Sequence, residues 1–432
     1  MNLVLFLGIL LVLGLASTRV VKLAKLPNVT GYLVVGLIAA VLCIIIDNYS
    51  NTNLTYDLNR MNEFISMIAL GFIALSIGEQ FKIAKLKEYG SKIVLITFLQ
   101  AFMAVVLVDV SLVLACVFLN LNVSIAICLG AIATATAPAA TLMVINQYKA
   151  NGPIVNILLP VVAFDDAIGL IVFAISLGVG KVFVSDAPIN VQSLLVVPLI
   201  EIVGSIVVGF ALGWLMNIVI KFFKSRNNHA ITIIAFTLLG VGTCELLNLI
   251  KINGENLEFS NLLCCMMIGA VYINFAKVET QPIVTRDFDL IDHWTPFLFM
   301  LFFVLSGTHL ATSAYQIITN GENSNIIVPV IIVFVIYIVT RSLGKYFGAF
   351  LGCKITKREK SVTDYLGITL LPQAGVAIGM ANQISGIEAF QSNNIGNIIV
   401  TVVLGATLIY ELVGPLLTKW VLVKTGEIDT LS

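Results

Sequence analysis

Long apolar runs constrain this chain more than any other feature of its sequence. A helix needs about 20 apolar residues to cross a bilayer. Runs of roughly that length recur thirteen times, separated by turn-like pieces such as Asn151-Gly152-Pro153. The predicted spans are 3–17, 28–46, 63–80, 92–118, 124–148, 154–180, 194–223, 229–249, 259–276, 292–316, 326–352, 362–384 and 396–423. The sequence therefore predicts an all-α membrane protein with about 13 transmembrane helices.

The composition agrees with a lipid environment. Hydrophobic residues make up 59% of the 432 residues and charged residues only 11%, whereas a soluble domain carries about 25% charged residues. The 24 basic and 24 acidic residues cancel, so no nucleic-acid partner is expected. The seven cysteines lie in apolar runs without metal-ligand spacing. We therefore expect no cofactor.

Basic residues outside the spans predict the orientation, because Lys and Arg gather on the cytoplasmic side of a membrane protein. If the turn with Arg19 and Lys22 is cytoplasmic, nineteen of the 24 basic residues fall on that side and three on the other. We therefore expect a cell (inner) membrane protein with its N-terminus outside and its C-terminus cytoplasmic. No soluble C-terminal regulatory domain is expected.

Some ionisable side chains remain inside the predicted spans, where each costs about 2.5–3.5 kcal/mol on insertion scales. Asp165 and Asp166 are adjacent in VVAFDDAIGLIVF, about 17 Å into their span at 1.5 Å per residue. Two carboxylates so close cannot both ionise cheaply. The pair therefore predicts a site near the midplane that holds either a proton or a small cation. The other membrane acids are Asp109, Glu201, Glu245 and Glu411.

Two spans contain helix breakers in corresponding places. In GAIATATAPAATLMVI (130–145), Pro138 frees the carbonyl of Thr134, and in GITLLPQAGVAIGMA (367–381) Pro372 and Gly375 interrupt the helix. Each interrupted span precedes a span with a membrane acid. Spans 4–6 and 11–13 therefore resemble two inverted repeats, which point to a secondary transporter with a midplane site.

The oxygen atoms around the first break suit a monovalent cation, and Thr134 and Thr136 are the candidate hydroxyl ligands beside the two aspartates. Arg341 and Lys345 lie four residues apart on one face of span eleven, so either could pair with the aspartates. Among the histidines, His293 and His309 lie near opposite ends of span ten, and His229 at the start of span eight is expected to be solvated.

These motifs give the chain a resemblance to a known family. ATATAPAAT (133–141), FDDAIGLIVF (164–173), TRSLGKYFGAFLG (340–352) and LLPQAGVAIGMA (370–381) resemble the monovalent cation:proton antiporter-2 family of bacterial sodium/proton and potassium/proton exchangers. The resemblance implies a homodimer with two discontinuous helices that cross in a mobile core. We expect the core at about 63–180 and 292–423 and the dimerisation domain at about 1–46 and 194–276.

The resemblance also implies residue roles. Asp166 would be the principal cation and proton ligand, and Asp165 would pair with a basic residue. Many relatives have lysine at that position, and Arg341 aligns with it here, with Lys345 one turn away as the alternative. Arginine keeps its proton in proteins, which favours electroneutral exchange.

The predicted function is therefore exchange of a monovalent cation for H⁺ by alternating access, with Na⁺ favoured over Li⁺ and K⁺. The alternatives are a sodium-coupled solute symporter, a channel and an intramembrane aspartyl protease. The protease is disfavoured because its two aspartates must face each other from separate helices.

Overall fold

The computed structural model describes residues 3–23, 26–50, 52–137, 141, 144–145, 148–184, 196–249, 251–252, 255–257, 259–275, 281–319, 326–391 and 394–428. Almost every described element is a helix. The first half comprises α1 (Leu3–Leu23), α2 (Asn28–Ser50), α3 (Leu54–Gln80), α4 (Ile83–Leu119), α5 (Ser124–Ile132), α7 (Pro153–Val184), α8 (Val197–Val219), the 3-10 helix η2 (Ile220–Phe222) and α9 (Arg226–Leu247).

The second half continues with a two-residue antiparallel ladder between β1 and β2, in which Lys251 pairs with Asn256. Its elements are β1 (Lys251–Ile252), β2 (Glu255–Asn256), α10 (Asn261–Phe275), α11 (Gln281–Trp294), α12 (Pro296–Thr319), α13 (Ile327–Ile355), α14 (Lys360–Thr369), α15 (Gly375–Gly386), α16 (Glu388–Gln391) and α17 (Ile395–Lys424). The expected all-α class is confirmed.

The thirteen predicted spans each contain a helix or an interrupted helix. Ten described helices are long and apolar enough to cross a membrane, and α10 is a shorter apolar helix. The remaining two spans are interrupted, after α5 and between α14 and α15. The amphipathic helix α11 was not predicted, and span ten begins at Pro296 instead of residue 292.

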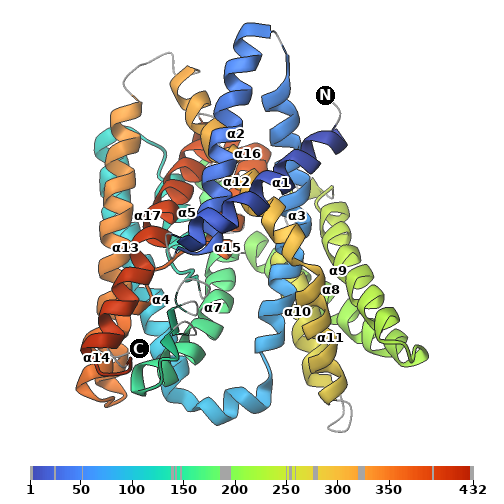
Figure 1. Ribbon diagram of the computed structural model, residues 1–432, viewed down its shortest axis with the longest axis vertical. Helices are drawn as coiled ribbons and strands as arrows, with labels where there is room; N and C mark the ends of the chain where they lie inside the picture. Colours follow the sequence, from blue (N-terminus) through green and yellow to red (C-terminus); the bar gives the residue numbers. More distant parts are fainter. Residues whose placement is uncertain are drawn as a thin grey trace.

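The long helices α4 and α13 pack side by side and nearly parallel to the longest axis of the molecule (Figure 1). A Cβ atom added at Gly348 would lie 2.5 Å from Cα of Gln100, and one at Gly344 would lie 2.6 Å from Cα of Ala104. The contacts descend along α4 as they ascend along α13, so the two helices are antiparallel. This close approach depends on glycine, and it brings Gln100 and Lys345 together.

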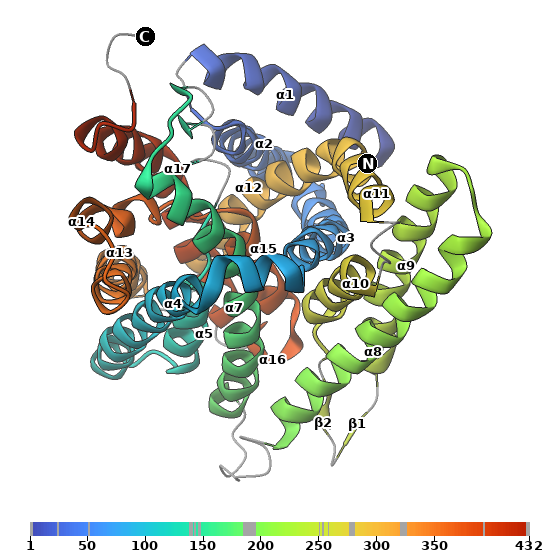
Figure 2. The same cartoon turned by 90° about the horizontal axis from the view of Figure 1, so that it is seen from below.

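The remaining helices lie on two sides of the molecule. Viewed from below, α8 and α9 lie at one edge and α13, α14 and α17 at the opposite edge, with α7 and α15 between them (Figure 2). Among these helices, α3 packs mainly along α10 and α12, and α12 packs mainly along α2. The expected core, at about 63–180 and 292–423, contains both α3 and α12, and α12 also packs along α17.

Candidate functional site

The two helix interruptions contact each other inside the bundle. The amide of Ala137, just after α5, donates to the carbonyl oxygen of Pro372 at 2.9 Å. The amide nitrogen of the Gln373 side chain donates to the carbonyl oxygen of Ile132, at the end of α5, at 3.0 Å. Pro138, the predicted cause of the first break, lies outside the described residues. The two breaks thus satisfy part of each other's exposed backbone.

Arg341, on α13, binds the free carbonyls of both breaks. Its guanidinium donates to the carbonyl oxygens of Ala133 at 3.2 Å, Ala135 at 2.7 Å and Leu371 at 2.8 Å. These groups follow the C-terminal ends of α5 and α14, where a helix carries partial negative charge. The guanidinium also lies 4.5 Å from the centre of the Tyr410 ring. The side chain is fully buried, so these carbonyls and the ring replace water around its charge.

Asp165 is surrounded by hydrogen-bond donors from three other elements. The Lys345 ammonium lies 2.8 Å from Oδ2 of Asp165 and also 2.8 Å from the Thr136 hydroxyl. The Thr136 hydroxyl donates to Oδ2 of Asp165, and the Gln100 amide donates to Oδ1. Asp165, Lys345 and Gln100 are all 0% exposed. Charge-assisted hydrogen bonds of this kind stabilise a buried carboxylate.

The basic partner of Asp165 is therefore Lys345. The alignment that put Arg341 at this position is corrected by one helical turn, because Arg341 is occupied by three backbone carbonyls. Lys345 also donates to the carbonyl oxygen of Thr134, the group that the predicted break frees. The Thr134 hydroxyl instead donates to its own helix, at the carbonyl of Ala131. Only the backbone of Thr134 thus reaches the aspartate cluster.

Asp166 differs from its neighbour. It is 8% exposed, and its Oδ1 atom has no hydrogen-bond partner among the described residues. A buried polar atom without a partner is costly, so this oxygen is free to take a proton or a cation. Within the described residues, no group of three or more His, Cys, Asp or Glu side chains could hold a metal ion. A cation here would therefore need hydroxyl or carbonyl oxygens in addition to the carboxylates.

The other predicted membrane acids lie in separate surroundings. Asp109, on α4, packs where a Cβ atom at Gly130 of α5 would stand 1.7 Å from its Oδ1. Glu411, on α17, is 0% exposed, and its two carboxylate oxygens have no partner among the described residues. Glu201, on α8, lies 3.5 Å from the ammonium of Lys181.

Two adjoining polar cavities open near the end of α15. Glu245 lines the smaller one, of about 220 Å³, together with Glu63, Glu388, Asn261 and Asn382. The larger cavity, of about 620 Å³, shares Glu63 and Asn382 and is also lined by His309 and Asn62. The ring of His309 has a partner here, because its Nδ1 atom lies 2.9 Å from Oδ1 of Asn382. Neither cavity is lined by Asp165 or Asp166.

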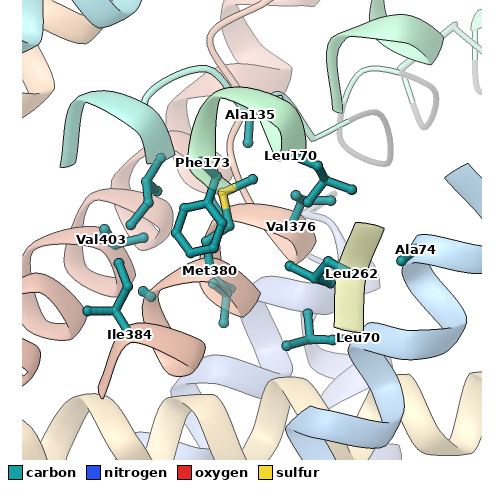
Figure 3. Close-up of a cluster of buried hydrophobic side chains, with 14 of the residues drawn as sticks. Leu70, Ala74, Ala135, Leu170, Phe173, Leu262, Val376, Met380, Ile384 and Val403 are labelled. Carbon is teal, nitrogen blue, oxygen red and sulfur yellow. The ribbon is translucent and has the colours of Figure 1, made fainter. Parts of the chain in front are cut away.

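An apolar cluster adjoins the smaller of these cavities. Figure 3 shows Leu70 of α3 and Leu262 of α10 facing Met380 of α15, with Phe173 of α7 beside them. Leu70 also lines the smaller cavity. A Cβ atom at Gly379 would lie 1.9 Å from Cδ2 of Leu70, so a larger residue there would displace the Leu70 side chain. The cluster thus joins side chains of α3, α7, α10 and α15 next to the smaller cavity.

Gln100 and Gln373 are the site residues that sequence reasoning missed. Each is an uncharged polar residue that is 0% exposed. Gln373 connects the Tyr337 hydroxyl to the first break, at 2.9 Å and 3.0 Å. A glutamine in an apolar span was the available signal, since a buried amide must find partners.

Comparison with known proteins supplies further observations. The profile of the family described as sodium/hydrogen exchanger, transmembrane, matches residues 7–424. No curated protein matches the chain. The solved structure of the sodium proton antiporter MjNhaP1 from Methanocaldococcus jannaschii at pH 8 is similar, with a TM-score of 0.71 and 19% identity over 98% of each chain. A second structure of that antiporter, from electron microscopy, has a TM-score of 0.67 and 19% identity over 99% of this chain and 98% of that one.

Proposed function

The chain belongs to the transmembrane sodium/hydrogen exchanger family, and we propose that Asp166 is the group for which its cation and its proton compete. The protein is thus a multi-span transporter that exchanges a cation for H⁺. The observation that carries the proposal is the contrast between two adjacent carboxylates. Asp165 accepts from three donors, whereas Oδ1 of Asp166 has no partner among the described residues.

In this proposal Asp165 is the fixed member of the pair. Moving an uncompensated charge through the bilayer interior is unfavourable, and the Lys345 ammonium balances Asp165 at 2.8 Å. The net charge of the aspartate–lysine site is then set by Asp166, which is neutralised by one proton or one Na⁺. Thr136 and the carbonyls of the breaks are the oxygen atoms nearest to the pair that could complete the cation's shell.

We further propose that α4, α5, α7, α13–α15 and α17 form the moving core and that the remaining long helices form the scaffold. In support, Arg341 joins α13 to both breaks, and Asp165 joins α7 to Lys345 of α13 and to Gln100 of α4. The apolar cluster around Leu70 and Met380 lies where the two groups meet. Its separation would open the aspartates toward the two polar cavities.

Several finer points also belong to the proposal. Na⁺ is the favoured cation, with Li⁺ and K⁺ as alternatives. The excess of basic residues on one side supports a cell-membrane location with the N-terminus outside and the C-terminus cytoplasmic. A homodimer is proposed from the resemblance stated above.

One-for-one, electroneutral exchange is the proposed stoichiometry, because a single carboxylate takes part. An arginine paired with the aspartate no longer supports it, since Lys345 makes that pair. A lysine can release its proton when it is buried. If Na⁺ displaced Lys345 from Asp165 and Lys345 lost a proton, two protons would exchange for one cation and transport would carry charge.

Proteoliposomes that contain a pH-sensitive dye test these points, with Na⁺, Li⁺ and K⁺ compared and with the voltage clamped by valinomycin. Proton competition predicts that the KM for Na⁺ rises about tenfold for each pH unit of acidification, once most of the binding-competent carboxylate is protonated. Asp166→Asn should abolish exchange, whereas the control Asp109→Asn, whose carboxylate faces Gly130 and not the aspartate pair, should retain it. Full exchange by Asp166→Asn would refute the assignment. If the exchange rate depends on the imposed membrane voltage, the two-proton scheme is favoured.

A further inference from the structure

His229, near the start of α9, is engaged on both of its ring nitrogens. Its Nδ1 atom lies 2.9 Å from Oδ2 of Asp287 on α11, and its Nε2 atom lies 3.0 Å from the carbonyl oxygen of Phe223. Only 12% of the histidine side chain and 2% of the Asp287 side chain are exposed. The expectation that His229 is solvated is therefore wrong.

The partners of His229 determine how many protons it carries. A backbone carbonyl can only accept a hydrogen bond, and an ionised carboxylate can only accept. Oδ2 of Asp287 also accepts from the Tyr272 hydroxyl at 2.6 Å, which fits an ionised carboxylate with two donors. A neutral imidazole has one N–H and can make only one of the two contacts. With Asp287 ionised, only the imidazolium form of His229 can therefore donate to both partners at once.

These contacts fasten α11 to the rest of the protein. Asp287 lies in the middle of α11 and contacts α9 through His229 and α10 through Tyr272. On the same side, the Arg226 guanidinium donates to the carbonyl oxygen of Arg286 at 3.3 Å. Thr295 alone separates α11 from α12, and α12 packs against α17. The helix α11 is therefore directly connected to a helix of the transmembrane bundle.

We propose that His229, Asp287, Tyr272 and the Phe223 carbonyl form a pH-sensitive clamp on α11. With the imidazolium form, both contacts are made and α11 is held. Histidine changes its charge between about pH 5 and 8, so alkalinisation removes one N–H. One contact is then lost together with the attraction between imidazolium and carboxylate. The clamp is thus closed at acidic pH and released as the pH rises.

The other charged groups on the surrounding elements cannot substitute for His229. They are Glu79 on α3, Lys221 and Lys224 before α9, Arg226 on α9, and Arg286, Asp289, Asp292 and His293 on α11. The lysines and arginines keep their charge well above pH 8. Burial, and then the charge of Asp289, raise the pKa of Asp292. That residue loses its proton as the pH rises, but it makes no contact in the clamp.

His293 is the matched control. It lies on the same helix, it is exposed, and its Nδ1 atom contacts only the carbonyl oxygen of Asp289, at 2.6 Å, within the part of the chain that the structure describes. His293→Gln should leave the clamp and its pH dependence unchanged. His229→Gln removes the titrating group, and Asp287→Asn removes the charge that the imidazolium attracts.

Hydrogen exchange measured by mass spectrometry in lipid nanodiscs without Na⁺ tests the clamp apart from transport. For peptides over residues 283–294, the wild type should lose about tenfold in protection between pH 6 and pH 8.5, after correction for intrinsic exchange. Asp287→Asn and His229→Gln should show no such change, and His293→Gln should follow the wild type. Equal protection of the wild type at both pH values would overturn the proposal, and this outcome needs no variant to fold. A pH response retained by His229→Gln would overturn it as well.

Discussion

Replacing Lys345 with methionine measures how strongly the buried ion pair holds the site together. The change removes an ammonium that lies 2.8 Å from Asp165 and contacts Thr136 and the Thr134 carbonyl. Both members of the pair are 0% exposed, so water cannot replace the lost charge. Removing one partner of such a pair costs about 3–5 kcal/mol. Arg341 cannot compensate, because three carbonyls hold its guanidinium.

The measurement is thermal unfolding of the purified protein, arranged as a double-mutant cycle. Lys345→Met should unfold at a clearly lower temperature, by roughly 5–10 °C at about 2 °C per kcal/mol. Lys345→Met combined with Asp165→Asn should recover most of the loss, because no unpaired charge remains. Lys354→Met, at an exposed position on the same helix, should change stability by less than about 0.5 kcal/mol. If Lys345→Met is no less stable than Lys354→Met, the buried ion pair is not what holds Asp165.

Three further substitutions probe the surroundings of the pair, each compared with the wild type by thermal unfolding and by sodium-driven proteoliposome exchange. Arg341→Lys should lower the free energy of unfolding by about 3 kcal/mol, because an ammonium cannot reach all three carbonyls and about two charged hydrogen bonds of about 1.5 kcal/mol each are lost. Wild-type stability would show that Arg341 does not hold the two breaks together. Gln100→Leu removes a donor to Asp165 and should lower the free energy of unfolding by about 1–3 kcal/mol. Exchange should persist with an altered KM for Na⁺, and an unchanged KM would show that Gln100 does not affect Na⁺ binding. The Glu427 carboxylate caps α7, because it accepts from the amides of Ile154 at 2.8 Å and Val155 at 3.1 Å. Glu427→Gln should lower the free energy of unfolding by about 1 kcal/mol, and unchanged stability would mean that the protein does not need this cap.

Hydropathy predicted the spans of this fold well because lipid imposes a length requirement that is local in sequence. Each run had to be long enough to cross the membrane, so the position of α7 or α17 could be found without knowing its neighbours. The amphipathic helix α11 escaped for the same reason. It is short, it carries several charged residues, and its apolar face packs on other helices instead of lipid.

The aspartate pair and the two breaks were also predictable, because each is unusual within an apolar run. The partner of Asp165 was not. Arg341 and Lys345 lie on one face of α13, and their order relative to the pair depends on how α13 lies against α4. That register is fixed by Gly344 and Gly348, where a Cβ atom would lie within 3 Å of the α4 backbone. Nothing local in the sequence reports such a contact between helices that lie so far apart along the chain.

In the structure, the two basic residues of α13 neutralise different groups, although the sequence alone could not tell them apart. Arg341 lies on carbonyls at the C-terminal ends of both half-helices and balances backbone dipoles there. Lys345 lies on the Asp165 carboxylate, next to the residue that is proposed to bind the cation. A permanently charged guanidinium suits the first position, and a point charge that can release a proton suits the second. If this division is right, exchanging the two residues, Arg341→Lys with Lys345→Arg, should stop transport even though the net charge of the site is the same. Wild-type exchange rates in that double variant would show that only the number of positive charges matters.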